Sequence, residues 1–110
     1  MKTLKFAADL VLLITSGSKT ATWRLFDDKD LQVGDELIFI NQASGQEFAT
    51  ARIVAMKEKA LGDIVENDFK GHELFESPEK MLETYRQYYG KKVDKNTLVK
   101  MLDFDILQLL

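Results

Sequence analysis

The sequence has no cysteine, a single histidine and a single proline among its 110 residues. Without cysteine the chain has no disulfide, no thiolate nucleophile and no cysteine-based zinc site. The lone histidine, His72, cannot build a conventional metal site without several carboxylates at the right spacing. We therefore expect neither a metal nor a cofactor, and we interpret His72 as a surface residue or one that supports a neighbouring site.

Long hydrophobic runs are also missing. The apolar stretch 10–14 is too short to span a bilayer, and no small-residue cleavage pattern of a signal peptide is evident. The length fits one domain, 1–110, and a composition that is 45% hydrophobic and 30% charged is ordinary for a globular protein. We expect an unprocessed, monomeric, cytoplasmic protein without membrane contact.

Net positive charge is lacking as well. The formal charge of −3 argues against broad, non-specific contact with nucleic acid, because such contact is mostly phosphate neutralisation. Binding of RNA or a nucleotide would need a local basic patch. One candidate is Lys19 with Arg24. The other is a C-terminal group that is more simply a solvated turn and strand face: Lys91, Lys92, Lys95 and Lys100.

The hydrophobic pattern predicts a mixture of strands and helices. Residues 3–6 alternate between polar and apolar, which indicates a short first strand. From Ala8 the apolar residues fall at helical spacing and Gly17 is placed to end a helix, although 11–14 could equally be a buried strand. Three β-rich stretches follow, the last two as a hairpin: 20–26, 36–41 and 47–56.

The only proline marks the clearest predicted element, a helix that begins at Pro78 with Ser77 as its N-cap. Its apolar face, which we expect to point to the core, comprises Met81, Leu82, Tyr85, Tyr88 and Tyr89. Gly90 ends the helix, and a last strand is expected over 98–107. The remaining segments are expected to be a turn, a short helix and an irregular acidic stretch: 27–30, 61–65 and 68–76. This order predicts an α+β fold with a curved sheet or partial barrel and helices at its ends.

Residues 17–24 are the most informative stretch, because no other segment places a cation, a hydroxyl and an arginine so close together. The stretch reads G-x-K-x-x-T-x-R. Alternate residues of a strand share a face, so we expect Thr20, Thr22 and Arg24 to face a pocket. Trp23 then points into the core, or else serves as a stacking platform for a base.

Part of this stretch makes chemical sense as a catalytic site. A threonine hydroxyl is a poor nucleophile without an adjacent base. A lysine is such a base only when burial or a nearby cation lowers its pKa from about 10.4. We expect Lys19 as a mobile base at the pocket mouth, Thr22 as the attacking group and Arg24 as the group that orients an anion or a carbonyl.

An acid for the leaving group must come from another part of the chain. We expect Glu73, which lies in an irregular loop before the capped helix, a common place for functional side chains. Asp68 and Glu76 are its rivals. Periodicity alone would leave all three carboxylates facing water.

The 17–24 signature resembles that of the ASCH (activating signal cointegrator homology) domains, a branch of the PUA-like fold. The resemblance extends to the turn at 33–37, the region of Glu73 and the closing strand at 102–104. It implies a PUA-like pseudo-β-barrel, mixed or antiparallel and flanked by short helices. It also implies binding of RNA, a nucleoside or a nucleotide in a cleft beside the signature strand.

The chain is similar in size and signature to a subset of small bacterial ASCH proteins. These are acetylcytidine amidohydrolases, which remove the acetyl group from the 4-amino nitrogen of acetylcytidine. The resemblance implies Lys19 as catalytic lysine, Thr22 as nucleophile and Glu73 as proton donor. The expected ligand-binding residues are Arg24, Thr20 and Trp23. Two functions stay open: this amidohydrolase, and a non-catalytic RNA-binding or regulatory interaction module.

Overall fold

The computed structural model describes all 110 residues, which form five strands, two α-helices and two short 3-10 helices. The strands are β1 (Lys2–Phe6), β2 (Ala21–Leu25), β3 (Glu36–Asn41), β4 (Glu47–Ala60) and β5 (Leu98–Leu109). The helices are α1 (Ala8–Thr15), η1 (Leu61–Asp63), η2 (Glu66–Phe69) and α2 (Pro78–Tyr89). The predicted α+β class is confirmed. None of these helices is both long and apolar enough to cross a lipid bilayer.

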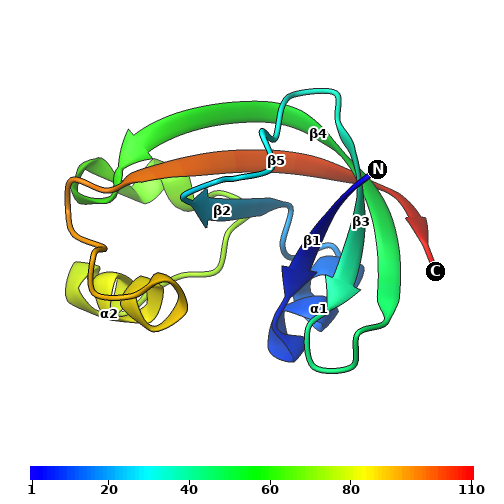
Figure 1. The fold of residues 1–110 in the computed structure, drawn as a ribbon, viewed down its shortest axis with the longest axis horizontal. Coiled ribbons are helices and arrows are strands. Elements are labelled where there is room, and N and C mark those ends of the chain that lie inside the picture. The colour runs from blue at the N-terminus through cyan, green and yellow to red at the C-terminus, as the bar shows by residue number, and fades with distance from the viewer.

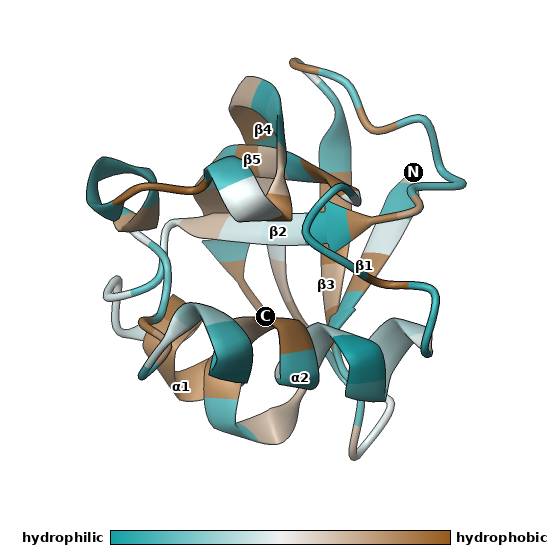
Figure 2. Ribbon diagram, turned by 90° about the vertical axis from the view of Figure 1, so that its left-hand side faces the viewer, coloured by the Kyte–Doolittle hydropathy of each residue, from teal (hydrophilic) through white to brown (hydrophobic).

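One mixed sheet carries the fold, with the strand order β1-β3-β4-β5-β2. β1 runs parallel to β3, and every other neighbouring pair is antiparallel. β4 and β5 are long, and irregularities in their register, such as the one between Ile53 and Ala55, add twist and bend. The sheet therefore curls into a half-barrel with α1 and α2 on the same side of β2 (Figures 1 and 2). This matches the predicted mixed pseudo-barrel flanked by short helices.

Side chains rather than backbone hydrogen bonds connect the two edge strands, β1 and β2. Arg24 of β2 donates from Nη2 to the carbonyl oxygen of Lys5 in β1, at 3.0 Å. Lys29, shortly after β2, donates to the carbonyl oxygen of Thr3. These cations satisfy carbonyl groups that an edge strand leaves unpaired. Arg24 is thereby held between the two edges of the half-barrel.

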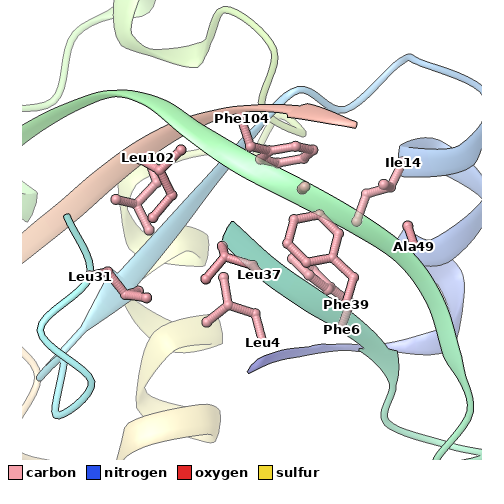
Figure 3. Packing of buried hydrophobic residues seen from close by; sticks show 11 residues of the cluster. Leu4, Phe6, Ile14, Leu31, Leu37, Phe39, Ala49, Leu102 and Phe104 are labelled. Carbon is pink, nitrogen blue, oxygen red and sulfur yellow. The ribbon is translucent and has the colours of Figure 1, made fainter. Parts of the chain in front are cut away.

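Two clusters of buried apolar side chains form the interior. The larger lies inside the curl of the sheet, where the rings of Phe6 and Phe104 pack against Phe39 (Figure 3). The smaller contains Trp23 together with Tyr85 of α2. Trp23 is only 4% exposed, so its predicted place in the core is confirmed.

Both predicted α-helices are present. α1 begins at Ala8, so the alternative of a buried strand at 11–14 is wrong. In α2 the Ser77 hydroxyl accepts a hydrogen bond from the Lys80 backbone N–H at 3.1 Å, and Pro78 opens the first turn as predicted. The cap and the proline start α2 just after the loop that carries Glu73.

Some details differ from the prediction. β4 continues beyond residue 56 to Ala60, because it stays paired with β5 over that length. The helix expected at 61–65 is a single 3-10 turn. Tyr88 is 64% exposed rather than core-facing, since it lies at the margin of the buried stripe formed by Met81 and Tyr85.

Candidate functional site

A cleft of about 420 Å³ opens between β2, the start of α1, the loop at 72–75 and α2. This volume is within the usual range for sites that bind small molecules. Aromatic rings make up much of its wall: Phe6, Trp23, Phe75, Tyr85, Tyr88 and Tyr89. Its polar side chains include those of Lys19, Thr22, Arg24, His72 and Glu73. The structure therefore brings the expected base, nucleophile and acid to one cleft.

Lys19 is buried, with its side chain only 2% exposed. Its Nζ donates to the carbonyl oxygen of Ala21 at 2.6 Å and to Oε1 of Glu73 at 2.5 Å. The expected mobile lysine at the pocket mouth is thus wrong, because these two acceptors hold the side chain inside. Burial lowers the Lys19 pKa; the Glu73 carboxylate opposes this, while the Arg24 cation adds to it, and the net change is downward.

Glu73 reaches Lys19 because its loop is tied to the start of β2. The backbone N–H groups of Thr20 and Ala21 both donate to the carbonyl oxygen of Gly71, at 2.8 and 3.0 Å. Gly71 has a φ of +79°, and a Cβ atom there would lie 2.2 Å from the Thr20 hydroxyl oxygen. Only glycine suits both the conformation and the space. The close approach at Gly71 therefore sets the position of Glu73.

The protonation of Glu73 depends on its two polar neighbours. Burial acts to raise the Glu73 pKa, but His72 and the Lys19 ammonium outweigh burial and lower it below its usual value. The resting pair is therefore a Lys19 ammonium and a Glu73 carboxylate that share one short hydrogen bond.

Thr22 and Arg24 point from β2 toward the cleft, on the face predicted from strand alternation. The Thr22 hydroxyl makes no hydrogen bond within the chain. It is not fully buried either, because the only enclosed side-chain nitrogen or oxygen without a partner is Nε of Arg24. The Thr22 hydroxyl is therefore free to meet a ligand.

The Arg24 guanidinium lies 4.8 Å from the centre of the Phe6 ring, and Nη2 is held by the Lys5 carbonyl. Burial is the main cause that lowers its pKa, although an arginine stays charged at neutral pH. A buried donor without a partner is costly. Arg24 thus presents a fixed, incompletely satisfied cation at the cleft.

His72 belongs to the same site, so of its two predicted places the one beside a neighbouring site agrees with the structure, and the surface place is wrong because the side chain is 3% exposed. Its ring stacks on Trp23, with centroids 3.9 Å apart and planes at 17°. Its Nδ1 lies 2.7 Å from the backbone oxygen of Glu73 and 3.3 Å from Oε1 of Glu73. Burial and the Lys19 charge lower the His72 pKa to about 4, against the opposing effect of Glu73, so the ring is neutral at pH 7. Its sequence position next to Glu73 was the only available signal.

The two rival acids lie elsewhere. Asp68 is buried on the far side of β2, where it accepts hydrogen bonds from Lys57 at 2.6 Å and Lys59 at 2.8 Å. Glu76 is exposed, makes no ion pair and does not line the cleft. Among the three candidates, only Glu73 lies beside Lys19.

Thr20 is not where strand alternation predicted it. β2 begins at Ala21, so Thr20 belongs to the preceding loop and does not follow the alternation. It is exposed and lines a second hollow of about 560 Å³ on the side where Asp68 lies. Trp23 lines both hollows, but His72 covers one face of its ring.

The C-terminal lysines do not form one patch. Lys100 is not on a solvated face, because it is 15% exposed and pairs with Asp27 at 2.8 Å. Lys92 lies over the ring of Phe26, 4.2 Å from its centre.

No group of three or more histidine, aspartate and glutamate side chains is close enough to hold a metal ion.

Solved structures match nearly the whole chain. A protein from Enterococcus faecalis matches with a TM-score of 0.79 and 20% identity over 93% of this chain and 72% of that one. An ASCH domain from Lactobacillus crispatus matches with a TM-score of 0.70 and 19% identity, over 96% of this chain and 78% of that one. An ASCH protein from Zymomonas mobilis matches with a TM-score of 0.69 and 13% identity, over 97% of this chain and 68% of that one. No protein-family model and no curated protein matches the sequence. At these identities the likeness is one of fold, and it confirms the fold that the sequence resemblance implied.

Proposed function

We propose that this chain, which has the fold of the ASCH domains, binds a nucleoside in the cleft beside β2 and hydrolyses an acyl amide on its base, with 4-acetylcytidine as substrate. The carrying observation is the convergence of Lys19, Thr22 and Glu73 on one cleft, with Lys19 and Glu73 in contact across 54 residues of sequence. A buried lysine paired with a partly buried glutamate, beside an unengaged threonine hydroxyl, supplies all the groups that amide hydrolysis needs.

The shape and lining of the cleft support a nucleoside ligand. Bases that are not paired in a duplex are commonly held by stacking on aromatic rings, and aromatic side chains form much of this wall. An uncharged nucleoside also avoids the repulsion that phosphate would meet from a chain with a net charge of −3. Arg24 supplies a cation for a carbonyl oxygen or for the oxyanion that develops during reaction.

The Lys19–Glu73 pair provides base and acid together. When the ligand excludes water, transfer of one proton from Lys19 to Glu73 along their hydrogen bond leaves a neutral amine and a carboxylic acid. The amine is then free to take the hydroxyl proton of Thr22. The carboxylic acid is free to protonate the departing nitrogen.

The reaction then follows two balanced steps. The Thr22 oxygen bonds to the acetyl carbon while Lys19 takes the hydroxyl proton. The carbon–nitrogen bond breaks as Glu73 protonates the nitrogen, which releases cytidine and leaves an acetyl ester on Thr22. Glu73 next takes a proton from water, the resulting hydroxide attacks the ester, and Lys19 returns its proton to the Thr22 oxygen. Acetic acid leaves, and proton transfer from Glu73 to Lys19 restores the resting pair.

Incubation of the protein with 4-acetylcytidine, followed by chromatography for cytidine, tests the proposal. We expect Thr22→Ala to lose at least a hundredfold in kcat, whereas Thr50→Ala, which removes a strand threonine outside the cleft, keeps full activity. Absence of cytidine above background in the unaltered protein, or full activity in Thr22→Ala, would reject the hydrolase.

A non-catalytic RNA-binding module is the second candidate, favoured by one specific observation. The exposed ring of Phe26 lies against Lys92 on one side and contacts Tyr89, part of the cleft wall, with ring centres 5.9 Å apart. An aromatic ring beside a lysine is a common arrangement for single-stranded nucleic acid. This candidate predicts binding of RNA without turnover.

A further inference from the structure

The hydrogen bonds of His72 determine which of its ring nitrogens carries the proton. Nδ1 lies 2.7 Å from the backbone carbonyl oxygen of Glu73, and a carbonyl oxygen only accepts hydrogen bonds. The second neighbour of Nδ1, at 3.3 Å, is the Glu73 carboxylate, which also accepts. Nδ1 is therefore the protonated nitrogen. In the neutral ring, Nε2 then carries a lone pair and no hydrogen.

Nε2 of His72 has no partner in the chain. It is not enclosed either, since Nε of Arg24 is the only fully buried side-chain nitrogen or oxygen without a hydrogen bond. His72 lines the cleft with Thr22 and Glu73. The stack on Trp23 fixes the plane of the imidazole, so the direction of the Nε2 lone pair is set before any ligand arrives.

Acceptors are scarce among the polar groups around Thr22. Arg24 and the Lys19 ammonium only donate, and Oε1 of Glu73 already accepts a hydrogen bond from Lys19. For a ligand that presents an N–H group near the scissile bond, Nε2 of His72 is an unoccupied acceptor whose orientation the stack on Trp23 has already fixed. The lowered pKa of His72, about 4, supports this role because the lone pair stays free at neutral pH.

We propose that His72 makes the site specific for secondary amides by accepting a hydrogen bond from the amide N–H of the substrate. The inference rests on the proposed function and narrows its substrate class to N-acylated primary amines, whose amide nitrogen keeps one hydrogen. A tertiary amide leaves the Nε2 lone pair without a donor in a dehydrated cleft, and a site with such an unpaired group discriminates against that ligand.

Two substrates and two variants test this specificity. The substrates are 4-acetylcytidine and its analogue methylated on the amide nitrogen, which lacks the N–H. The variants are His72→Asn and His72→Gln. Both remove the ring that stacks on Trp23, but the asparagine amide reaches only the Nδ1 position, whereas the glutamine amide brings an oxygen to the Nε2 position. The kcat/KM ratio of the two substrates is compared among the variants and the unaltered protein.

We expect His72→Asn to lower the preference for the secondary amide by about tenfold or more, in line with the loss of one buried hydrogen bond. His72→Gln should keep the preference within about threefold of the unaltered protein, because its oxygen replaces the acceptor. An unchanged ratio in His72→Asn, with circular dichroism showing a folded protein, would overturn the inference while leaving the hydrolase intact.

Binding separates failure of this inference from failure of the proposed function. Trp23 is the only tryptophan and stacks on His72, so its fluorescence reports ligand entry. If the unaltered protein hydrolyses neither compound, the hydrolase falls. Tighter binding of the secondary amide in the unaltered protein but not in His72→Asn would still support the recognition role. In that case, equal binding of the two compounds by the unaltered protein, or binding of neither, would overturn the recognition role of His72.

Discussion

Lys19 is the residue on which most of the site depends. It is buried, and its Nζ has one carboxylate partner, Glu73. Replacement by methionine removes the base. Burial still raises the Glu73 pKa in this variant, but the Lys19 cation that lowers that pKa is gone. The Glu73 pKa therefore rises in Lys19→Met, and the carboxyl group no longer cycles between acid and base.

We expect Lys19→Met to lower kcat on 4-acetylcytidine by about 10² to 10⁴, the range for loss of a positioned acid–base group. The matched control is Lys59→Met. It also removes a lysine from a buried carboxylate, Asp68, but on the far side of β2, and Asp68 keeps Lys57. Steady-state kinetics on both variants check the prediction, and equal losses in the two would contradict it.

His72 predicts a pH dependence of stability. Its pKa is about 4 in the folded chain and near 6.5 when unfolded, so between these values the unfolded chain binds more protons. Stability from this group is therefore complete above about pH 6.5 and is lost as the pH falls toward 4. The expected loss between pH 7 and pH 5 is about 2 kcal/mol.

Urea unfolding at pH 7 and pH 5 measures this change, with His72→Phe as the comparison. Phenylalanine keeps a ring against Trp23 and cannot titrate, so its stability should vary less over this range. The same slope in both proteins would show that other groups are responsible.

At the level of the strands and helices, sequence patterns predicted what depends on local chemistry. The cap and proline at 77–78 located α2, and alternation along β2 separated Thr22 and Arg24 from Trp23. The pattern failed at Lys19 and Thr20, because Glu73 holds the Lys19 side chain and the Gly71 carbonyl holds the Thr20 N–H, and both partners lie far along the chain. Long-range contacts of this kind leave no periodic signal in the sequence.

The tie between the loop and β2 can be broken at Gly71. In Gly71→Ala the backbone keeps a φ unfavourable for alanine, and the new Cβ meets the Thr20 hydroxyl oxygen at 2.2 Å. We expect a loss of about 2 to 4 kcal/mol in unfolding free energy, from strain and overpacking together, and a displaced Glu73. Gly45→Ala is the matched control, since φ is +74° there but nothing lies within 4 Å of a Cβ.

Denaturant unfolding and kcat distinguish the two glycine variants. Gly45→Ala should cost only the backbone strain, about 1 to 2 kcal/mol, and should keep its activity because the turn is remote from the cleft. Gly71→Ala should lose activity at temperatures where it remains folded. Full activity in folded Gly71→Ala would show that Glu73 does not need this tie.

For the molecule as a whole, charge separates the two candidate functions. The chain is acidic overall, and the exposed lysines Lys91 and Lys92 follow the end of α2, with Lys92 over the ring of Phe26. A nucleoside carries no phosphate, so its binding releases no counterions and responds little to salt. Single-stranded RNA that places two phosphates on these lysines would lose about sevenfold in affinity between 50 and 200 mM salt.

We expect kcat/KM for 4-acetylcytidine to change by less than about twofold over this salt range. The double variant Lys91→Ala/Lys92→Ala should then hydrolyse the nucleoside as well as the unaltered protein does, because neither lysine lines the cleft. Parallel measurement of single-stranded RNA affinity completes the comparison. One outcome would favour the RNA-binding module: RNA binding that is sensitive to salt and depends on the two lysines, with no hydrolysis of 4-acetylcytidine. Electrostatic contact with phosphate would then be the only activity that the cleft and its rim support.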